Sequence, residues 1–175
     1  MSHSMDDDAR FEALYRAHAS SVRAYARRRL TSEALADDVV SDVFLVVWRR
    51  LGEVPPQPRP WLYGIARRAL ANRRRGEARA IALRERITSE RRDGTAGAAD
   101  ESGRVLRALA RLSEPDRELL LLVAWEGLAA SDVAEALDAR PGTIAVRLHR
   151  ARRRLADALA TEDQIADAPP TEAYR

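Results

Sequence analysis

The sequence contains no cysteine and no lysine. Without cysteine there can be no disulfide framework and no thiolate metal site. Aromatic residues make up only 5% of the 175 residues, so a core must rely mainly on aliphatic side chains. No apolar run approaches the ~20 residues that cross a bilayer, and the first residues lack the basic and apolar regions of a signal peptide. These absences favour a cytoplasmic protein without membrane insertion.

All 30 basic residues are therefore arginine, and they are unevenly distributed along a chain whose net charge is only +3. Residues 59–92 hold 11 arginines and 3 acids, and residues 140–155 hold 6 arginines and no acid. Two basic islands in a nearly neutral chain indicate two contacts with a polyanion. The alternative is that both islands are solvated helix faces.

The first half of the chain has helical periodicity over residues 9–87. Apolar residues recur at helical spacing around Phe11, and a valine-rich stripe around Val39 and Val43 predicts a second buried helix, capped by Thr31 or Ser32. The proline-rich stretch 52–60 cannot be helix interior. Pro60 instead suits the first turn of a further helix, from Trp61 to about Arg79.

A linker and a second helical block follow. Residues 88–103 are small, polar and glycine-containing, which predicts a flexible linker. Residues 104–160 are again periodic, with Ser113 placed to cap a helix that ends at Gly127. Residues 161–175 form an acidic stretch that we expect to be disordered. The predicted fold class is all-α, with two small helical domains joined by this linker.

The last part of that block has the pattern of a helix-turn-helix. A short helix over 130–137, a turn at 138–142 and a long basic helix follow one another. An apolar stripe through Ile144 and Ala151 would pack inward, whereas the arginines, Arg154 included, would lie on the opposite side. A surface helix kept soluble by arginine is the alternative, but such helices normally mix charges of both signs.

Three stretches together resemble the extracytoplasmic-function (ECF) sigma factors of bacterial RNA polymerase. They are ALADDVVSDVFLVVWRRL (34–51), WLYGIARRALANRRR (61–75) and the helix-turn-helix block over 104–155. The resemblance implies an N-terminal region 2-like bundle and a C-terminal region 4-like domain. It also implies a non-enzymatic subunit without a cofactor, which directs core RNA polymerase to promoter DNA, assists promoter opening and is held inactive by an anti-sigma factor.

By resemblance, the helix over 34–51 would dock on core polymerase. The residues implied are Asp37, Asp38, Asp42, Phe44 and Trp48. Asp38 and Asp42 are four residues apart and share one helix face. Two alternatives remain open: the acids could simply favour the helix dipole, and the two aromatic residues could belong to the core. A metal or acid–base site is not expected, because no histidine or further acid completes a helical pattern nearby.

The helix over 61–75 would recognise the −10 element as separated strands. Its expected contact residues are Trp61, Arg67, Arg68, Asn72, Arg73 and Arg74. Arginine charge follows a single-stranded backbone, and planar groups hold unstacked bases. The family often has Asn where Arg68 stands and Asp where Asn72 stands, so the identity of the captured base is left open. Trp61 could instead be part of the core.

The final helix would bind the −35 element. Its expected contact residues are Thr143, Ala145, Val146, Arg147, His149, Arg150 and Arg153, and the helix-turn-helix frame includes Ser131, Leu137, Gly142 and Leu148. Arg150 suits a guanine through its bidentate fork, and Val146 suits a thymine methyl. Asp138 stands at the usual turn glycine, where Asp tolerates the left-handed conformation. Ala129 replaces a usual cap, so we expect Ser131 to cap the short helix.

Two other functions fit parts of the sequence. A stand-alone helix-turn-helix repressor would bind a duplex operator unaided, but it has no need of a basic strand-binding helix at 61–75. A recombinase would need a nucleophile or metal-binding carboxylates, whereas the serines here fall at helix caps and in the linker.

Overall fold

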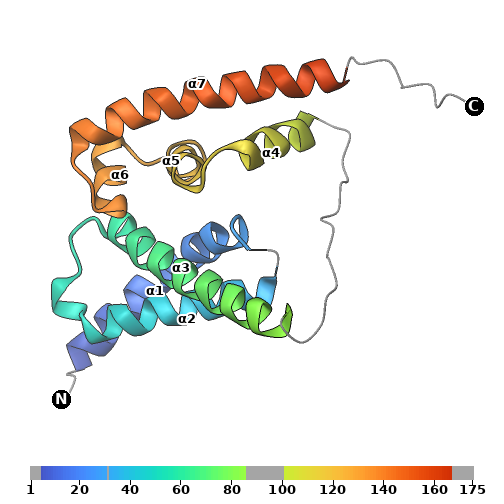
Figure 1. Cartoon of the computed structure of the whole chain (residues 1–175). Helices are drawn as coiled ribbons and strands as arrows, with labels where there is room; N and C mark the ends of the chain where they lie inside the picture. The colour runs from blue at the N-terminus through green and yellow to red at the C-terminus, as the bar shows by residue number, and fades with distance from the viewer. Residues whose placement is uncertain (1–4, 31, 86–100, 167–175) are drawn as a thin grey trace, which may run out of the picture. The chain divides into compact units, whose positions relative to one another are not determined.

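The computed structural model describes residues 5–30, 32–85 and 101–166, and all regular structure in these ranges is helical. The all-α prediction is confirmed. The chain divides into two compact units, one built mainly on the first three α-helices and the other mainly on α4, α5 and α7 (Figure 1). Within the described ranges no helix combines the length and apolarity that a membrane span requires. Of the predicted linker, residues 88–100 lie outside the described part and residues 101–103 belong to α4.

The N-terminal unit consists of α1 (Met5–Arg27), α2 (Glu33–Arg49), the short 3-10 turn η1 (Leu51–Glu53) and α3 (Pro58–Glu85). Ser32 is the N-cap of α2, because its Oγ accepts a hydrogen bond from the backbone N–H of Leu35. The third helix begins three residues earlier than predicted, at Pro58, and continues past Arg79 to Glu85. Pro58 and Pro60 both fit in its first turn, where no intrahelical donor is required.

The core of this unit is built from small aliphatic side chains and one aromatic stack. Val39, Val43 and Val47 on α2 are completely buried, which confirms the predicted stripe. Fully burying a valine contributes roughly 1.5–3 kcal/mol. Tyr25 of α1 and Tyr63 of α3 stack with ring centroids 5.0 Å apart and an interplanar angle of 17°. This stack joins the first and third helices in the centre of the unit.

The C-terminal helices are α4 (Glu101–Arg111), α5 (Glu114–Ala124), α6 (Ala130–Leu137) and α7 (Pro141–Ala166). Ser113 caps α5 as predicted, with its Oγ accepting from the N–H of Asp116. The helix ends at Ala124, before Gly127, whose φ of 64° lies in the left-handed region. Gly127 therefore belongs to the turn that follows α5.

The long helix α7 packs along α5 and α4 (Figure 1). Ile144 and Ala151 are completely buried, as the apolar stripe predicts. Between α6 and α7 the chain turns at Asp138, which has a φ of 52°. The predicted left-handed conformation at this aspartate is confirmed, and it stops α6 so that α7 can start in a new direction.

The acidic residues after position 160 are ordered as far as the structure describes them. The last helix continues to Ala166, so residues 161–166 are helical rather than disordered, and residues 167–175 lie outside the described part. Glu162 is only 5% exposed and pairs with Arg107 (2.8 Å) and Arg111 (2.7 Å) of α4. Asp163 pairs with Arg104 at 2.5 Å. The acids that suggested a disordered stretch thus join the end of α7 to α4.

We predict that Glu162→Gln destabilises the C-terminal unit by about 1–2 kcal/mol, because it removes the carboxylate that two arginines share. Urea unfolding followed by far-UV circular dichroism measures the change. Asp157→Asn is the matched control, since Asp157 is exposed on the same helix. Equal stabilities for the two variants would show that the cluster contributes nothing.

We also predict an acid-sensitive N-terminal unit. Burial, and then the positive charge of Arg59, lower the pKa of His18 on α1. A histidine in the unfolded chain accepts a proton near its ordinary pKa of ~6.5, whereas the folded chain accepts it only at lower pH. The contribution of neutral His18 to stability is therefore present above ~6.5 and is lost as pH falls through the lowered folded pKa.

The measurement is the urea midpoint between pH 7 and pH 5 in a Trp125→Phe background, where the fluorescence comes from Trp48 and Trp61 of the N-terminal unit. His18→Gln should flatten the decrease in midpoint over this range. An identical pH dependence with and without His18 would contradict the assignment.

Candidate nucleic-acid interface

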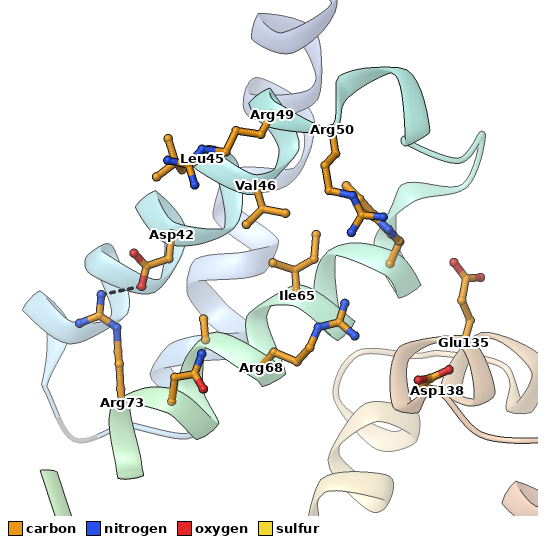
Figure 2. Close-up of a pocket in the computed structure, with 13 residues that line it drawn as sticks. Asp42, Leu45, Val46, Arg49, Arg50, Ile65, Arg68, Arg73, Glu135 and Asp138 are labelled. Carbon is orange, nitrogen blue, oxygen red and sulfur yellow. Dashed lines mark hydrogen bonds and ion pairs between the residues drawn. The ribbon is translucent and has the colours of Figure 1, made fainter. Parts of the chain in front are cut away.

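The outer face of α2 carries two carboxylates that share one arginine of α3. Asp38 and Asp42 lie one helical turn apart, and the guanidinium of Arg73 pairs with both, at 3.1 Å and 2.7 Å. Figure 2 shows the Arg73 side chain extending from α3 to Asp42. Both carboxylates remain about half exposed, whereas the Arg73 side chain is 28% exposed. The structure therefore joins residues for which the sequence predicted two separate functions.

The third predicted acid faces a different helix. Asp37 pairs with Arg23 of α1 at 2.6 Å, in a small cleft that includes Tyr15 and Ser41. Asp38 and Asp42 face α3, so the three acids divide between two sides of α2. All three nonetheless remain exposed, and the described structure gives each of them an arginine as counter-ion.

The two aromatic residues of α2 join a cluster with α1. Phe44 is only 3% exposed and lies edge-on to Tyr15 at 4.7 Å, while Trp48 lies edge-on to Phe11 at 5.0 Å. The alternative that Phe44 belongs to the core is thus correct. Above the cluster runs an open apolar groove that includes Leu45, which is 49% exposed. Leu45 was not among the residues predicted to dock on polymerase, although the sequence shows it as an apolar residue off the buried stripe of α2.

A groove between α2 and α3 includes four of the six residues predicted to bind single-stranded DNA, namely Trp61, Arg68, Asn72 and Arg73. Arg68 and Asn72 are exposed on α3, and Val46 and Ile65 lie between the two helices (Figure 2). Arg49 from the end of α2 also lines the groove, as does Arg50, whose guanidinium pairs with Glu53 (Figure 2). These two arginines were not predicted as site residues, although the pair at the end of a valine-rich helix was visible in the sequence.

The individual residues predicted for this site differ in their burial and contacts. Trp61 is half-buried, with the guanidinium of Arg50 5.8 Å from its ring centroid. Arg67 is half-buried, and the groove residues do not include it. Asn72 accepts a hydrogen bond from Arg75 at 2.5 Å, which orients its side-chain amide. The side chain of Arg74 is outside the described part of the chain.

The start of α7 presents one exposed face. The exposed residues of the predicted set are Thr143, Ala145, Val146, His149, Arg150 and Arg153. Arg147 is half-buried, as are Leu137 and Leu148 of the helix-turn-helix frame, and Gly142 is exposed at the start of the helix. The buried Ile144 and Ala151 fix this orientation, so a polar and basic surface faces solvent along the first turns of α7.

The side chain of Arg154 is 60% exposed, in agreement with the prediction, but its guanidinium pairs at 2.5 Å with the buried carboxylate of Asp116 on α5. One expectation for this domain is wrong. Ser131 does not cap the short helix, since α6 already begins at Ala130 and the Ser131 hydroxyl bonds to the side chain of Asp132. Ala129 instead provides the carbonyl that accepts from Val133, so the backbone starts this helix without a side-chain cap.

Comparison with known protein families matches both halves of the chain. The sigma-70 region 2 family matches residues 14–80, and the sigma-70 region 4 family matches residues 102–155. The fold and these matches define a sigma factor of RNA polymerase.

The relatives narrow the class further. The ECF RNA polymerase sigma factor SigK of Mycobacterium sp. (strain KMS) is 31% identical over 164 residues, which cover 88% of this chain and 84% of SigK. CarQ of Myxococcus xanthus, an RNA polymerase sigma factor, is 32% identical over 158 residues, covering 85% and 88%. The ECF sigma factor SigL of Mycobacterium tuberculosis (strain H37Rv) is 30% identical over 158 residues, covering 84% and 87%. The chain belongs to the ECF RNA polymerase sigma factors.

Solved structures support the same fold. CnrH in complex with the cytosolic domain of CnrY matches with a TM-score of 0.61 and 26% identity, covering 90% of this chain and 89% of CnrH. The sigma factor RpoE of Bartonella quintana, bound to the anti-sigma factor NepR, matches with a TM-score of 0.65 and 23% identity, covering 86% and 96%. The RpoE likeness concerns the fold.

We predict that Arg154→Gln lowers the free energy of unfolding of the C-terminal unit by about 1–2 kcal/mol, because Asp116 is left buried without its cation. Urea unfolding measures this loss. Arg152→Gln is the control, since Arg152 is exposed two residues away and should change stability by less than ~0.5 kcal/mol. A loss of the same size in both variants would count against the Asp116 pair.

Proposed function

We propose that this ECF sigma factor divides promoter recognition between the groove of α2 and α3, for the −10 element, and the exposed face of α7, for the −35 element. The observation that carries the proposal is that arginines are exposed on both surfaces while apolar residues hold each helix in place. In this division the N-terminal unit assists strand opening and the C-terminal unit positions the polymerase on duplex DNA.

The groove suits separated strands. Exposed Arg68 and Arg49 provide positive charge for the phosphate backbone, and the apolar groove residues Val46 and Ile65 offer contact to an unstacked base. Asn72 provides an amide that can hydrogen-bond a base edge. Extracting a base from the stack costs a few kcal/mol, so a site that holds the extracted base favours the open promoter.

The face of α7 suits a major groove. Arg150 is exposed near the start of the helix, where its fork can reach the O6 and N7 atoms of a guanine. Val146 is 51% exposed and can contact a thymine methyl. Arg147 and Arg153 are the phosphate contacts in this proposal, and they fix the register of the helix on the duplex.

Docking on core polymerase is assigned to α2. Asp37, Asp38 and Asp42 provide exposed negative charge, and Leu45 with Trp48 provides apolar contact at the groove beside them. Phe44 supports this surface from the core. We assign no catalytic step to the chain, because a sigma factor acts as a specificity subunit of the polymerase. It would act in the cytoplasm, where promoter DNA and polymerase are found.

An anti-sigma factor is also part of the proposal. RpoE of Bartonella quintana was solved in complex with the anti-sigma factor NepR, and its fold covers most of this chain. A partner of this kind would compete with core polymerase for the exposed surface of α2.

We predict that core polymerase supplemented with this chain initiates transcription at specific promoters. Two variants should separate promoter binding from strand opening. Arg150→Gln should weaken promoter binding about tenfold or more, the effect of losing one bidentate base contact. The double variant Arg68→Gln/Asn72→Ala should leave duplex binding intact and reduce strand opening. Sequencing of transcripts made in vitro identifies the promoters, and permanganate reactivity of thymines measures opening.

Arg16→Gln removes one charge from an exposed site on α1 and is the control for net charge. The proposal is contradicted if no promoter-specific transcript forms, or if the free chain binds duplex promoter as tightly as the complete holoenzyme does.

A further inference from the structure

We propose that Arg73 is a shared counter-ion that couples polymerase binding to DNA binding within the N-terminal unit. In the free chain the two carboxylates of α2 hold Arg73, which keeps it from a DNA strand. When core polymerase places its own cation on Asp38 or Asp42, Arg73 is released toward the groove. This inference rests on the proposed function, because it uses the surfaces assigned there.

The geometry allows one arginine to serve both surfaces. Arg73 belongs to α3, next to Asn72, and is itself one of the residues that line the strand-binding groove. Its two terminal nitrogens donate hydrogen bonds to two different carboxylates, Nη1 to Asp38 and Nη2 to Asp42. Every contact that Arg73 makes with these acids is therefore unavailable to a phosphate.

The electrostatics favour exchange over a permanent bond. Asp38 and Asp42 are like charges one turn apart, so they repel each other unless a cation lies between them. Together with Arg73 they carry a net charge of −1, which attracts a further cation. Both carboxylates are about half exposed, so a partner can reach them without unfolding the unit.

When Arg73 pairs with Asp38 and Asp42, one of its hydrogen-bond donors is left without a partner in the part of the chain that the structure describes. Its Nε is buried and has no hydrogen-bond partner within the described residues. A buried donor without an acceptor is unfavourable, which lowers the cost of leaving this position.

The coupling must be reciprocal. If a polymerase cation on the carboxylates frees Arg73 for DNA, then DNA phosphate on Arg73 must leave the carboxylates uncompensated and strengthen polymerase binding by the same factor. The chain thereby holds DNA weakly when alone and firmly when bound to core.

The first experiment measures DNA binding by the free full-length chain. The probe is a fluorescein-labelled oligothymidine of about 20 nucleotides, long enough for a sequence-tolerant strand site. Asp38→Asn/Asp42→Asn should bind the probe about tenfold more tightly than the original chain. The slope of log K against log salt should steepen by about 0.7, the value for one more phosphate contact on a single strand.

The matched control is Glu12→Gln/Glu33→Gln. It removes the two carboxylates of the same unit that pair with Arg16 and Arg27. The net charge of the chain therefore changes by the same amount as in the α2 double variant. A control that binds DNA as tightly as the α2 double variant would reduce the effect to net charge and overturn the proposal. Adding Arg73→Gln to the α2 double variant should remove the gain, whereas Arg73→Gln alone should change binding by less than about twofold.

The second experiment measures affinity for core polymerase by competition with a labelled original chain. Arg73→Gln should bind core several-fold more tightly, because its carboxylates have lost their internal cation. Weaker binding by a variant that melts like the original chain would overturn the proposal. A lower melting temperature with both affinities unchanged would also overturn it, since Arg73 would then be purely structural.

Different results would contradict the Arg73 coupling and the proposed function of the groove. If Arg68→Gln/Asn72→Ala impairs promoter opening but the α2 double variant binds the probe like the original chain, the coupling is wrong and the function stands. If Arg68→Gln/Asn72→Ala opens promoters normally, the assignment of the groove is itself wrong.

Discussion

Burial of a narrow aliphatic stripe on each helix is the interaction on which both units depend. With few aromatic residues available, valine, leucine and alanine fill most of the interior, and the Tyr25–Tyr63 stack is the large exception. Arginine–carboxylate pairs then join neighbouring helices at the edges of these stripes. Pairs that are exposed on both sides, such as Arg23 with Asp37, contribute little stability each, but they select which helix faces meet. The abundance of arginine thus serves the fold as well as binding.

Much of this architecture could be predicted from the sequence because it follows from local rules. Helical periodicity gave the stripes of α2 and α7, and Ser32 and Ser113 cap the helices that they precede. Prolines marked the start of α3, and Asp138 was expected at its left-handed turn. The partners of charged residues could not be predicted. In the sequence Arg154 and Glu162 look like solvated residues, because their partners lie on helices that are distant along the chain.

In the candidate sites, too, the features set by local rules could be predicted and the contacts between distant residues could not. The exposed face of α7 was predictable, because burying Ile144 fixes which residues point outward. The α2 surface was only half predictable: its acids are exposed, but Phe44 is buried and Leu45 is not. No helical wheel could show that Arg73 reaches Asp38 and Asp42, because the residues that pair are more than 30 positions apart. Such pairings depend on how α3 crosses α2.

The length of α7 has a practical consequence. The region 4 match stops at residue 155, yet the helix continues to Ala166 and its last turns are fastened to α4. At ~1.5 Å per residue it is a single rod about 39 Å long, with the residues proposed to contact the promoter near one end and the anchoring acids near the other. A fragment cut at the family boundary for crystallisation or domain swapping would keep every side chain of the proposed promoter surface and discard the anchor.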